Sequence, residues 1–349
     1  MSKQHDYKKI LVVQLRQLGD ILLTTPVCEA LKKKYPEAHI SFLSHPMGKL
    51  VLDNNPYIDE ILYYPLKNKD YPSFLYKLRS AEFDLVFDFM FNFRSAFFSR
   101  ITGAKKRVSF ESRRGFFFTD LVARNAKEKM YIAQDKFRLL EQVGIYEKAP
   151  NLTLTWSEKD LEKTKAFLNQ FDQKDIRVIM SPTHRREKRK WNLKKYAMVS
   201  DFLAQRWGAK VIWLWGPGEE ECIDEVMNLT NEVSYKAPST GFREMAALVG
   251  QADLFIANSN GPSHVAVSCN TPSIQLHGPT HDVSWCPLNM YHQSVNGGSF
   301  PSSMENISIS SVISKLDGME EVIHTAKASR QELKFFRNYK ESVERFSRN

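Results

Sequence analysis

Apolar runs alternate with helical segments along this chain, and the alternation starts twice. The first series of runs covers residues 8–15, 39–44, 60–65 and 83–89. The second series follows a Glu- and Lys-rich helix over 158–169 and contains runs at 176–182, 209–216, 252–258 and 271–278, with helices over 193–206, 219–229 and 242–249 between them. Runs without strict alternation are typical of strands buried on both faces of a parallel sheet. We therefore expect an α/β protein with mostly parallel sheets covered by helices.

The length of 349 residues suits two domains better than one core. We place the first domain at 1–150, with a linker at 148–151, and the second at 151–320. Residues 321–349 are expected to form a basic helix that packs back on the first domain, with Leu333, Phe335 and Phe336 as its docking face. Two such domains would bind a ligand at the carboxyl ends of their strands, in the cleft between them.

The spacing of the cysteines and the character of the N-terminus indicate whether the chain binds a metal and in which cell compartment it lies. The four cysteines form no CxxC pair and no Cys/His metal spacing, so neither a disulfide framework nor a zinc site is indicated. The N-terminal apolar run of about six residues is too short for a signal sequence or a membrane span, and we expect a cytoplasmic protein. Asp84 and Asp88 share one strand but form no DxD pair, so we expect structural or cleft-facing roles for them, with no metal and no cofactor.

The net charge of +9 is concentrated in one stretch. Residues 94–138 contain twelve basic and four acidic side chains. Such a surplus indicates an anionic partner, which leaves open nucleic acid, an anionic membrane face and a phosphorylated or carboxylated substrate. A solvated face without a partner is the alternative.

A strand–turn–helix segment over 252–280 is the strongest candidate for binding a ligand. Asn258 ends the strand, the turn runs from Ser259 to Pro262, and His264 lies near the start of the helix. The start of a helix presents unbonded N–H groups and the positive end of a dipole, which suits a diphosphate. Gly261 would allow close approach of the backbone, and His264 would add a hydrogen bond or a charge. The alternative is an ordinary turn in which Asn260 caps the helix and His264 lies at the surface.

A cationic loop at 181–192 also follows a strand. It carries the cations Arg185, Arg186, Lys188, Arg189 and Lys190 directly before Trp191. Several cations at the carboxyl end of a strand suit phosphate binding; a solvated loop with a packed Trp191 is the alternative. No aromatic ladder or recognised motif supports nucleic-acid binding.

Two further turns carry carboxylates after strands. Asp20 follows the first strand, ahead of a helix that we expect to continue to about Lys34 with Pro26 in its first turn. An exposed Asp20 could act as a general base toward an acceptor hydroxyl; a helix N-cap is the alternative. Glu219 or Glu220, after the Gly216–Gly218 turn, could bind a ribose diol. The chain contains neither GxGxxG nor GxxxxGK[ST], so it has no dinucleotide fingerprint and no P-loop.

Together these motifs resemble glycosyltransferase family nine, the bacterial heptosyltransferases, from about Lys9 to Pro287. The resemblance rests on Leu18-Gly19-Asp20 with Thr25-Pro26, on the K-x-W-like segment ending at Trp191, and on the segment from Asn258 to Ala266 followed by Gly278-Pro279-Thr280. It implies a GT-B architecture, in which two Rossmann-like domains face a central cleft. It also implies inverting transfer of heptose from ADP-heptose to the lipopolysaccharide core, with the protein peripheral at the inner face of the inner membrane.

The resemblance also assigns roles to residues. Asp20 matches the family's catalytic base. The matching donor-binding positions are Lys188, Arg189, Glu219, Thr240, Ser259, Asn260, Gly261 and His264. The basic stretch becomes a surface for the anionic acceptor, with Arg113, Arg114, Lys136 and Arg138 as the expected contacts.

Ser259 departs from the family pattern, which has an aspartate at this position in N-D-S-G. The aspartate helps to hold the hydroxyls of the donor sugar, and loss of a charged acceptor costs about 1.5–3 kcal/mol. Asn260, which follows, would compensate in part. Two alternatives stay open: a transferase of the same family with another nucleotide sugar, and a degenerate homologue that binds without turnover.

Overall fold

The computed structural model describes residues 6–124 and 129–332 of the chain. The chain divides into two compact units, Met1–Thr155 (unit 1) and Trp156–Asn349 (unit 2). Residues 125–128 of the basic stretch, with Lys127 and Glu128, lie outside the described residues, as do Leu333, Phe335 and Phe336 of the expected C-terminal docking face.

Unit 1 is built on a six-stranded parallel sheet with the order β3-β2-β1-β4-β5-β6. Its strands are β1 (Lys9–Val13), β2 (His39–Ser44), β3 (Glu60–Tyr63), β4 (Leu85–Asp88), β5 (Lys106–Phe110) and β6 (Asp120–Val122). Its helices are α1 (Leu18–Leu22), α2 (Thr25–Lys34), α3 (Lys49–Leu52), α4 (Tyr71–Ser80), α5 (Phe93–Ile101) and α6 (Ile132–Phe137), with short 3-10 turns η1 (Pro46–Gly48), η2 (Asn68–Asp70), η3 (Gly115–Phe117) and η4 (Arg138–Val143).

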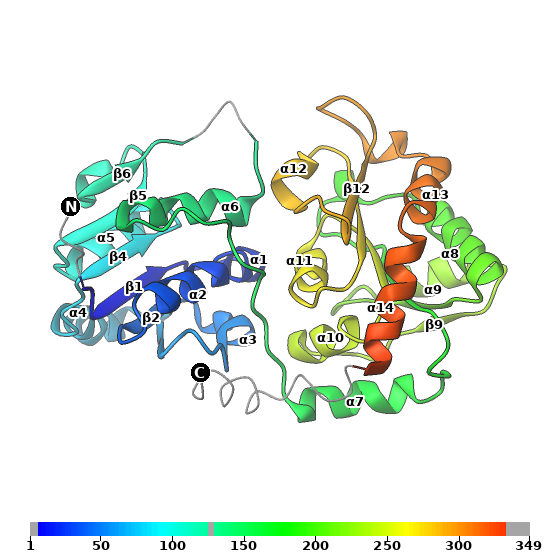
Figure 1. The fold of residues 1–349 in the computed structure, drawn as a ribbon, viewed down its shortest axis with the longest axis horizontal. Helices are drawn as coiled ribbons and strands as arrows, with labels where there is room; N and C mark the ends of the chain where they lie inside the picture. The colour runs from blue at the N-terminus through cyan, green and yellow to red at the C-terminus, as the bar shows by residue number, and fades with distance from the viewer. Residues whose placement is uncertain (1–5, 125–128, 333–349) are drawn as a thin grey trace. The chain divides into compact units, whose positions relative to one another are not determined.

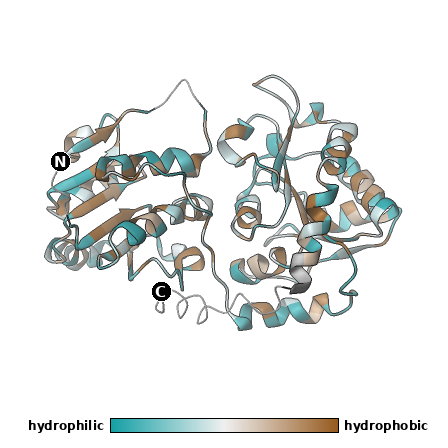
Figure 2. Ribbon diagram, viewed as in Figure 1, coloured by the Kyte–Doolittle hydropathy of each residue, from teal (hydrophilic) through white to brown (hydrophobic). Residues whose placement is uncertain are grey.

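The central strands of unit 1 are buried along most of their length, as the uninterrupted apolar runs predict. β1 is KILVV with only Lys9 exposed, and β4 is LVFD with every residue buried. Figure 2 shows these strands as apolar ribbons beneath helices of mixed character. α4 and α5 pack together, and α2 packs on α6, so helices cover the sheet (Figure 1).

The expected single helix from Asp20 to Lys34 is instead two helices, α1 and α2. Pro26 has no N–H to offer the carbonyl of Leu22, and the Thr25 hydroxyl donates to that carbonyl at 2.8 Å instead. Thr24 in turn donates to the carbonyl of Asp20 at 2.8 Å. The helix therefore ends at Leu22 and restarts at Thr25, with Pro26 in the first turn of α2.

Unit 2 repeats the plan of unit 1. Its six parallel strands lie in the order β12-β11-β10-β7-β8-β9, which matches that of unit 1 when each set is numbered along the chain. This order is that of dinucleotide-binding folds. The strands are β7 (Arg177–Ser181), β8 (Lys210–Trp213), β9 (Ser234–Lys236), β10 (Leu254–Asn258), β11 (Ser273–His277) and β12 (His292–Asn296).

The helices of unit 2 form two groups, α7, α10 and α11 in one and α8, α9 and α13 in the other, that flank the sheet (Figure 1). They are α7 (Glu158–Leu168), α8 (Leu193–Trp207), α9 (Glu220–Asn228), α10 (Phe242–Val249), α11 (Gly261–Ser268), α12 (Asp282–Trp285), α13 (Ile309–Asp317) and α14 (Glu320–Glu332), with 3-10 turns η5 (Glu187–Arg189) and η6 (Met304–Asn306). Ile323 of α14 is buried in the core of unit 2. The expected α/β class with two parallel sheets is confirmed. Within 6–124 and 129–332, no helix combines the length and apolar character needed to span a bilayer.

Candidate functional site

The carboxyl edge of each sheet has one point where neighbouring strands send their chains to opposite sides. In unit 2 this point lies between β7 and β10, and in unit 1 between β1 and β4. Open α/β sheets bind ligands at such switch points. The predicted donor-binding residues follow β7, β8, β9 and β10, and Asp20 follows β1.

Asn258 fastens the cationic loop to the switch point of unit 2. Its fully buried amide donates to the carbonyl of Pro182 at 2.7 Å and accepts the N–H of Trp191 at 3.0 Å. The Trp191 indole donates to the carbonyl of Ile307 at 3.1 Å and lies within the core. Trp191 is thus part of the core. The cations before it lie on a loop that Asn258 holds at both ends, at Pro182 and at Trp191.

Asn260 is the N-cap of α11, and its side chain is used for structure. Its Oδ1 accepts the N–H of Ser263 at 3.2 Å, and its Nδ2 donates to the Thr183 carbonyl at 3.2 Å and to Ser181 Oγ at 3.3 Å. The expectation that Asn260 takes over sugar binding from the missing aspartate therefore has no support in this geometry. Ser259 lies half-buried between the two asparagines, with its N–H bonded to the Leu276 carbonyl at 3.0 Å.

Two glycines of the motifs have different surroundings. A Cβ on Gly278 would lie 2.7 Å from the backbone nitrogen of Met304, so packing excludes any side chain there. A Cβ on Gly261 would meet no atom within 4 Å. Gly261 is exposed at the first position of α11, where helix geometry leaves N–H groups without intrahelical partners. Packing within the protein therefore gives no reason for glycine at 261, and the open space beside it leaves room for a ligand to approach the backbone.

The charge at this edge comes from arginine and lysine rather than from histidine. Arg189 is half-buried and Lys188 is exposed on η5. Burial lowers the pKa of His277 to about 4, and the Arg189 charge acts in the same direction. The pKa of His184 is also lowered, by burial first and then by Arg189. Both rings are thus neutral at pH 7, while His264, buried near the start of α11, packs its ring 6.0 Å from that of Trp285.

Glu219 joins the loops that follow β7 and β8. Its Oε2 accepts the hydroxyl of Thr183 at 2.7 Å and the N–H of Gly216 at 2.9 Å. The neighbouring Glu220 begins α9 and lies 3.2 Å from Lys236. Thr240 is half-buried in the segment between β9 and α10. Of the two carboxylates, Glu219 is the one fixed at the strand ends.

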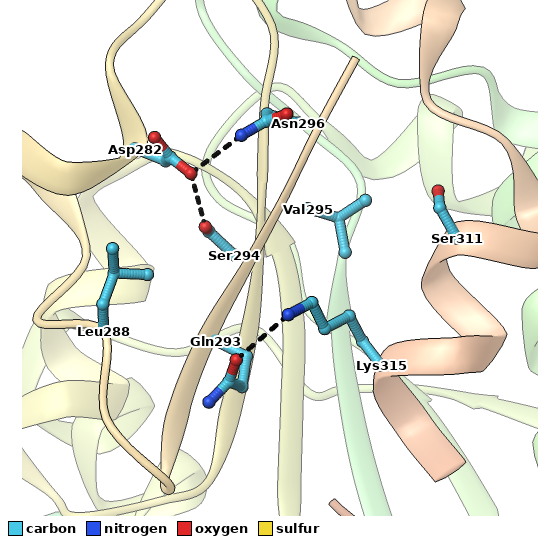
Figure 3. Close-up of a pocket in the computed structure, with 8 residues that line it drawn as sticks. All are labelled: Asp282, Leu288, Gln293, Ser294, Val295, Asn296, Ser311 and Lys315. Carbon is cyan, nitrogen blue, oxygen red and sulfur yellow. Dashed lines mark hydrogen bonds between the residues drawn. The ribbon is translucent and has the colours of Figure 1, made fainter. Parts of the chain in front are cut away.

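A pocket of about 500 Å³ lies beside the edge strand β12, two strands away from β10 (Figure 3). The Asp282 carboxylate accepts Ser294 Oγ at 2.7 Å and Asn296 Nδ2 at 2.9 Å, and Lys315 donates to Gln293 at 3.3 Å. The two Asp282 bonds tie α12, which follows the Gly278-Pro279-Thr280 segment, to β12, and the Lys315 bond ties α13 to the same strand. The two charged side chains of the pocket, Asp282 and Lys315, are thus each hydrogen-bonded to neutral side chains of β12.

At the switch point of unit 1, Asp20 occupies the third position of α1 rather than a turn or an N-cap. Its carboxylate faces back along the helix, where Oδ2 lies 3.4 Å from the N–H of Gln17. Asp20 is half-exposed. One long hydrogen bond leaves most of the carboxylate's acceptor capacity for another group.

Lys136 is a buried cation directly behind Asp20, and no sequence pattern pointed to this arrangement. Its ammonium donates to the Asp20 carbonyl at 2.8 Å, to Thr24 Oγ1 at 2.8 Å and to Gln14 Oε1 at 3.0 Å. Burial lowers its pKa to about 8, against the opposing charges of Asp20 and Asp135. The expectation of an exposed, acceptor-binding Lys136 is wrong, because all three ammonium protons are used inside unit 1.

The remaining cations of the basic stretch do not form one uniform surface. Arg113 is exposed, whereas Arg114 is half-buried and donates to the Phe91 carbonyl at 3.1 Å. Arg138 pairs with Asp135 at 3.0 Å and donates to the Ala123 carbonyl at 2.9 Å. Arg107 lies in β5 and donates to the Phe117 carbonyl at 2.9 Å. Part of the charge surplus thus holds loops of unit 1 in place.

Asp84 and Asp88 are both structural. Asp84 accepts the N–H groups of Lys8 and Lys9 at 2.7 and 2.9 Å, at the start of β1. Asp88 is fully buried at the end of β4, where it accepts the N–H of Met90 at 2.7 Å. Among the described residues, no group of three or more His, Cys, Asp or Glu side chains is arranged to hold a metal ion.

Comparison with known proteins identifies the family. The model of glycosyltransferase family 9 (heptosyltransferase) matches residues 72–306. Lipopolysaccharide heptosyltransferase 3 of Escherichia coli strain K12 is 30% identical over 289 residues, which cover 78% of this chain and 83% of that protein.

Solved structures agree in fold. A family 9 glycosyl transferase of Veillonella parvula superposes with a TM-score of 0.79 at 22% identity, covering 92% of this chain and 99% of the other. The E. coli ADP-heptose LPS heptosyltransferase II superposes with a TM-score of 0.74 at 18% identity, covering 91% and 99%. This chain therefore belongs to glycosyltransferase family 9, the heptosyltransferases, and is a glycosyltransferase of GT-B fold.

Proposed function

We propose that this protein transfers heptose from ADP-heptose to the lipopolysaccharide core, with inversion at the anomeric carbon. Family membership and the 30% identical lipopolysaccharide heptosyltransferase support the heptose and the acceptor. The name of one structural neighbour, an ADP-heptose LPS heptosyltransferase, suggests the ADP-linked donor. The observation that carries the proposal is Gly261, a glycine that the fold does not need, at the start of a helix beside a cationic loop.

Unit 2 holds the donor in this proposal. The diphosphate lies at the start of α11, where Gly261 lets it approach the backbone, and Arg189 and Lys188 supply positive charge. Glu219 receives the ribose hydroxyls, Thr240 lies in the adenine pocket, and His264 contributes a hydrogen bond. Because Ser259 replaces the aspartate of the family pattern, the donor sugar is held by a neutral hydroxyl at this position.

Asp20 acts as the general base in unit 1. Its carboxylate takes the proton of an acceptor hydroxyl, and that oxygen attacks the anomeric carbon on the face opposite the diphosphate. The bond between the anomeric carbon and the diphosphate breaks, and ADP leaves with the electron pair. Arg189, Lys188 and the helix N–H groups stabilise its charge without a metal. Lys136 fixes the backbone of Asp20 from behind.

The acceptor carries carboxylates and phosphates and lies at an anionic leaflet. Arg113 and Arg114 are the proposed contacts with it, and Arg138 stays a weaker candidate because Asp135 already pairs with it. We place the enzyme in the cytoplasm, at the inner face of the inner membrane. A polybasic surface contributes about 1 kcal/mol per Lys or Arg near such a membrane.

Donor identity is tested by mass spectrometry of a heptose-deficient core acceptor incubated with ADP-heptose and, separately, with other ADP-, UDP- and GDP-sugars. We expect a heptose mass increment with ADP-heptose and an inverted anomeric configuration in the product. A product only from another sugar would favour a transferase with a different donor, which the Ser259 departure motivates. Donor binding without any product would favour a degenerate binding homologue.

A further inference from the structure

The carboxyl edge of unit 1 carries exposed aromatic side chains beyond its switch point. The sheet order places β4 beside β1, then β5 and β6. The chain leaves β4 into α5 and leaves β5 into η3, on the same edge as Asp20. Phe93 at the start of α5 is 61% exposed, and Phe116 in η3 is 76% exposed. A phenylalanine held this far into water loses the burial that stabilises most aromatic side chains.

These aromatic rings form one connected group. The ring of Phe93 stacks on that of Phe97 at 6.3 Å between centroids and meets Phe117 edge-on at 5.8 Å. Phe117 in turn packs on Phe116 at 4.4 Å. Leu121, itself 41% exposed, lies over Gly115 at the base of η3. We call Phe93, Phe97, Phe116, Phe117 and Leu121 the aromatic edge.

Arginines surround the aromatic edge. Arg94 directly follows Phe93 in the sequence, Arg113 shortly precedes Phe116, and both are exposed. The guanidinium of Arg124, also exposed, lies 4.4 Å from the ring centroid of Phe91, the residue to whose carbonyl Arg114 donates. The acids of these loops are Glu111, which is exposed, and Asp120, which lies 3.4 Å from Lys106. Cations thus outnumber acids around an apolar centre.

We propose that the aromatic edge inserts into the headgroup–acyl boundary of an anionic bilayer, with Arg94, Arg113 and Arg124 against the lipid phosphates. The choice of partner rests on the proposed function, in which the acceptor is a lipid of an anionic leaflet. Apolar side chains ringed by cations suit this boundary, because the rings leave water while the guanidinium groups meet anionic headgroups. Insertion at this edge brings the membrane to the side of unit 1 that carries Asp20.

The chain offers a matched control at the opposite edge of the same sheet. Tyr146 is 77% exposed, comparable to Phe116. It follows η4 and Gly144, whose carbonyl accepts from Lys34 at the end of α2. Lys106, the first residue of β5, likewise donates to the carbonyl of Gln142 at 2.7 Å. Tyr146 therefore lies near the amino ends of the strands, away from the aromatic edge.

The test is sedimentation of the full-length protein with vesicles. Wild type, Phe93→Ser/Phe116→Ser and Tyr146→Ser are each mixed with phosphatidylcholine vesicles or with equal parts phosphatidylcholine and phosphatidylglycerol. We expect wild type to bind the anionic vesicles, less so at high salt. The double variant should bind about a hundredfold more weakly or worse, since each of the two buried phenylalanines contributes at least about a factor of ten. Tyr146→Ser should bind like wild type.

Equal binding of wild type and the double variant, or no binding of wild type, would overturn the proposal. A dimeric wild type, a monomeric double variant and no vesicle binding would instead make the aromatic edge an interface between copies of the chain. A second assay separates this inference from the proposed function. With a soluble, delipidated core oligosaccharide the double variant should keep wild-type turnover, whereas transfer to lipopolysaccharide in vesicles should fall. If no sugar is transferred at all, the proposed function fails, and vesicle binding still decides the membrane proposal.

Discussion

The two units share one strand order but fix their switch points with different chemistry. In unit 2 the loops are fastened by the neutral amides of Asn258 and Asn260. In unit 1 the corresponding edge contains two buried ionisable groups, Lys136 and Asp88, beside the half-exposed carboxylate of Asp20. The amides of Asn258 and Asn260 do not titrate, so the anchoring that they provide at the edge of unit 2 should not depend on pH. The edge of unit 1, which carries the proposed base, should depend on pH. Burial lowers the pKa of Lys136 and raises that of Asp88, so both values move closer to pH 7.

The largest expected effect distinguishes the proposed base from other carboxylates on the edge of unit 1. Asp20→Asn should lower kcat by roughly 10²–10⁴-fold, because the amide cannot take the acceptor proton. Glu111→Gln, an exposed carboxylate after β5, should leave kcat unchanged. Steady-state kinetics with the core acceptor measures both variants. Wild-type turnover by Asp20→Asn would show that another group, or none, acts as the base.

Replacing Lys136 tests whether this buried lysine, which donates to the carbonyl of Asp20, makes the stability of unit 1 depend on pH. Its pKa of about 8 in the folded protein lies below the value of roughly 10.4 in an unfolded chain. The unfolded chain therefore binds more protons between these two values, and the free energy of unfolding should rise with pH through this window, by up to about 3 kcal/mol.

Lys136→Met should remove this increase and lower kcat roughly tenfold by loosening α1, with little change in the KM for the donor. Denaturant titrations from pH 7 to 10.5, together with kinetics, provide the two readouts. Lys136→Arg is a second variant that keeps the charge. If the pH dependence of stability persists in Lys136→Met, the buried lysine is not its source.

Asn258→Ala tests the neutral anchor of unit 2. It leaves the Trp191 N–H and the Pro182 carbonyl without their buried partner, which costs about 1–3 kcal/mol of unfolding free energy. Unlike the effect of Lys136→Met, this loss should be the same at every pH from 5 to 10. Urea unfolding at several pH values measures it. A strongly pH-dependent loss would remove the contrast between the two edges.

The smallest effect is expected at Asp88, and it is a gain in stability. Burial raises its pKa to about 6, above the value of roughly 3.9 in an unfolded chain. The folded protein therefore binds more protons between pH 4 and 6, and stability should fall as the pH rises through that window.

Asp88→Asn keeps an acceptor for the N–H of Met90 and carries no charge, so it should raise stability at pH 7 by on the order of 1 kcal/mol. The substitution should also reduce the dependence of the unfolding free energy on pH between pH 4 and 6. Thermal unfolding of the variant and of wild type at pH 4, 6 and 7 measures both effects. A variant less stable than wild type at pH 7 would contradict the prediction that the buried charge of Asp88 destabilises the protein.

The sequence predicted the central strands closely, because fully buried parallel strands are continuous apolar runs. β2 and α10 have the predicted bounds, and β10 and β11 lie inside the predicted ranges. The strands β5 and β6 escaped prediction, since KRVSF begins with two cations and DLV is only three residues long. The break between α1 and α2 depends on hydroxyl bonds from Thr24 and Thr25, which a pattern of apolar positions does not register.

The sequence correctly placed some of the candidate residues at the ends of strands, while their roles stay predictions. The turn at 259–264 and Glu219 lie at strand ends, as expected from the order of elements. Lys136 was misassigned because its role depends on contacts with residues more than a hundred positions earlier in the chain. The use of Asn260 as a cap was one of two alternatives, and only its bonds to Ser181 and Thr183 settle how the side chain is used.

The central claim, that chemistry belongs to the edge of unit 1 and donor binding to that of unit 2, is tested most directly by calorimetric titration of ADP. The titration compares wild type, Asp20→Asn and Gly261→Val. Gly261→Val should fold normally, because a Cβ there meets nothing, but its side chain would occupy the space proposed for the diphosphate. We predict wild-type ADP affinity for Asp20→Asn and loss of binding for Gly261→Val. Unchanged binding by Gly261→Val, or lost binding by Asp20→Asn, would contradict the account.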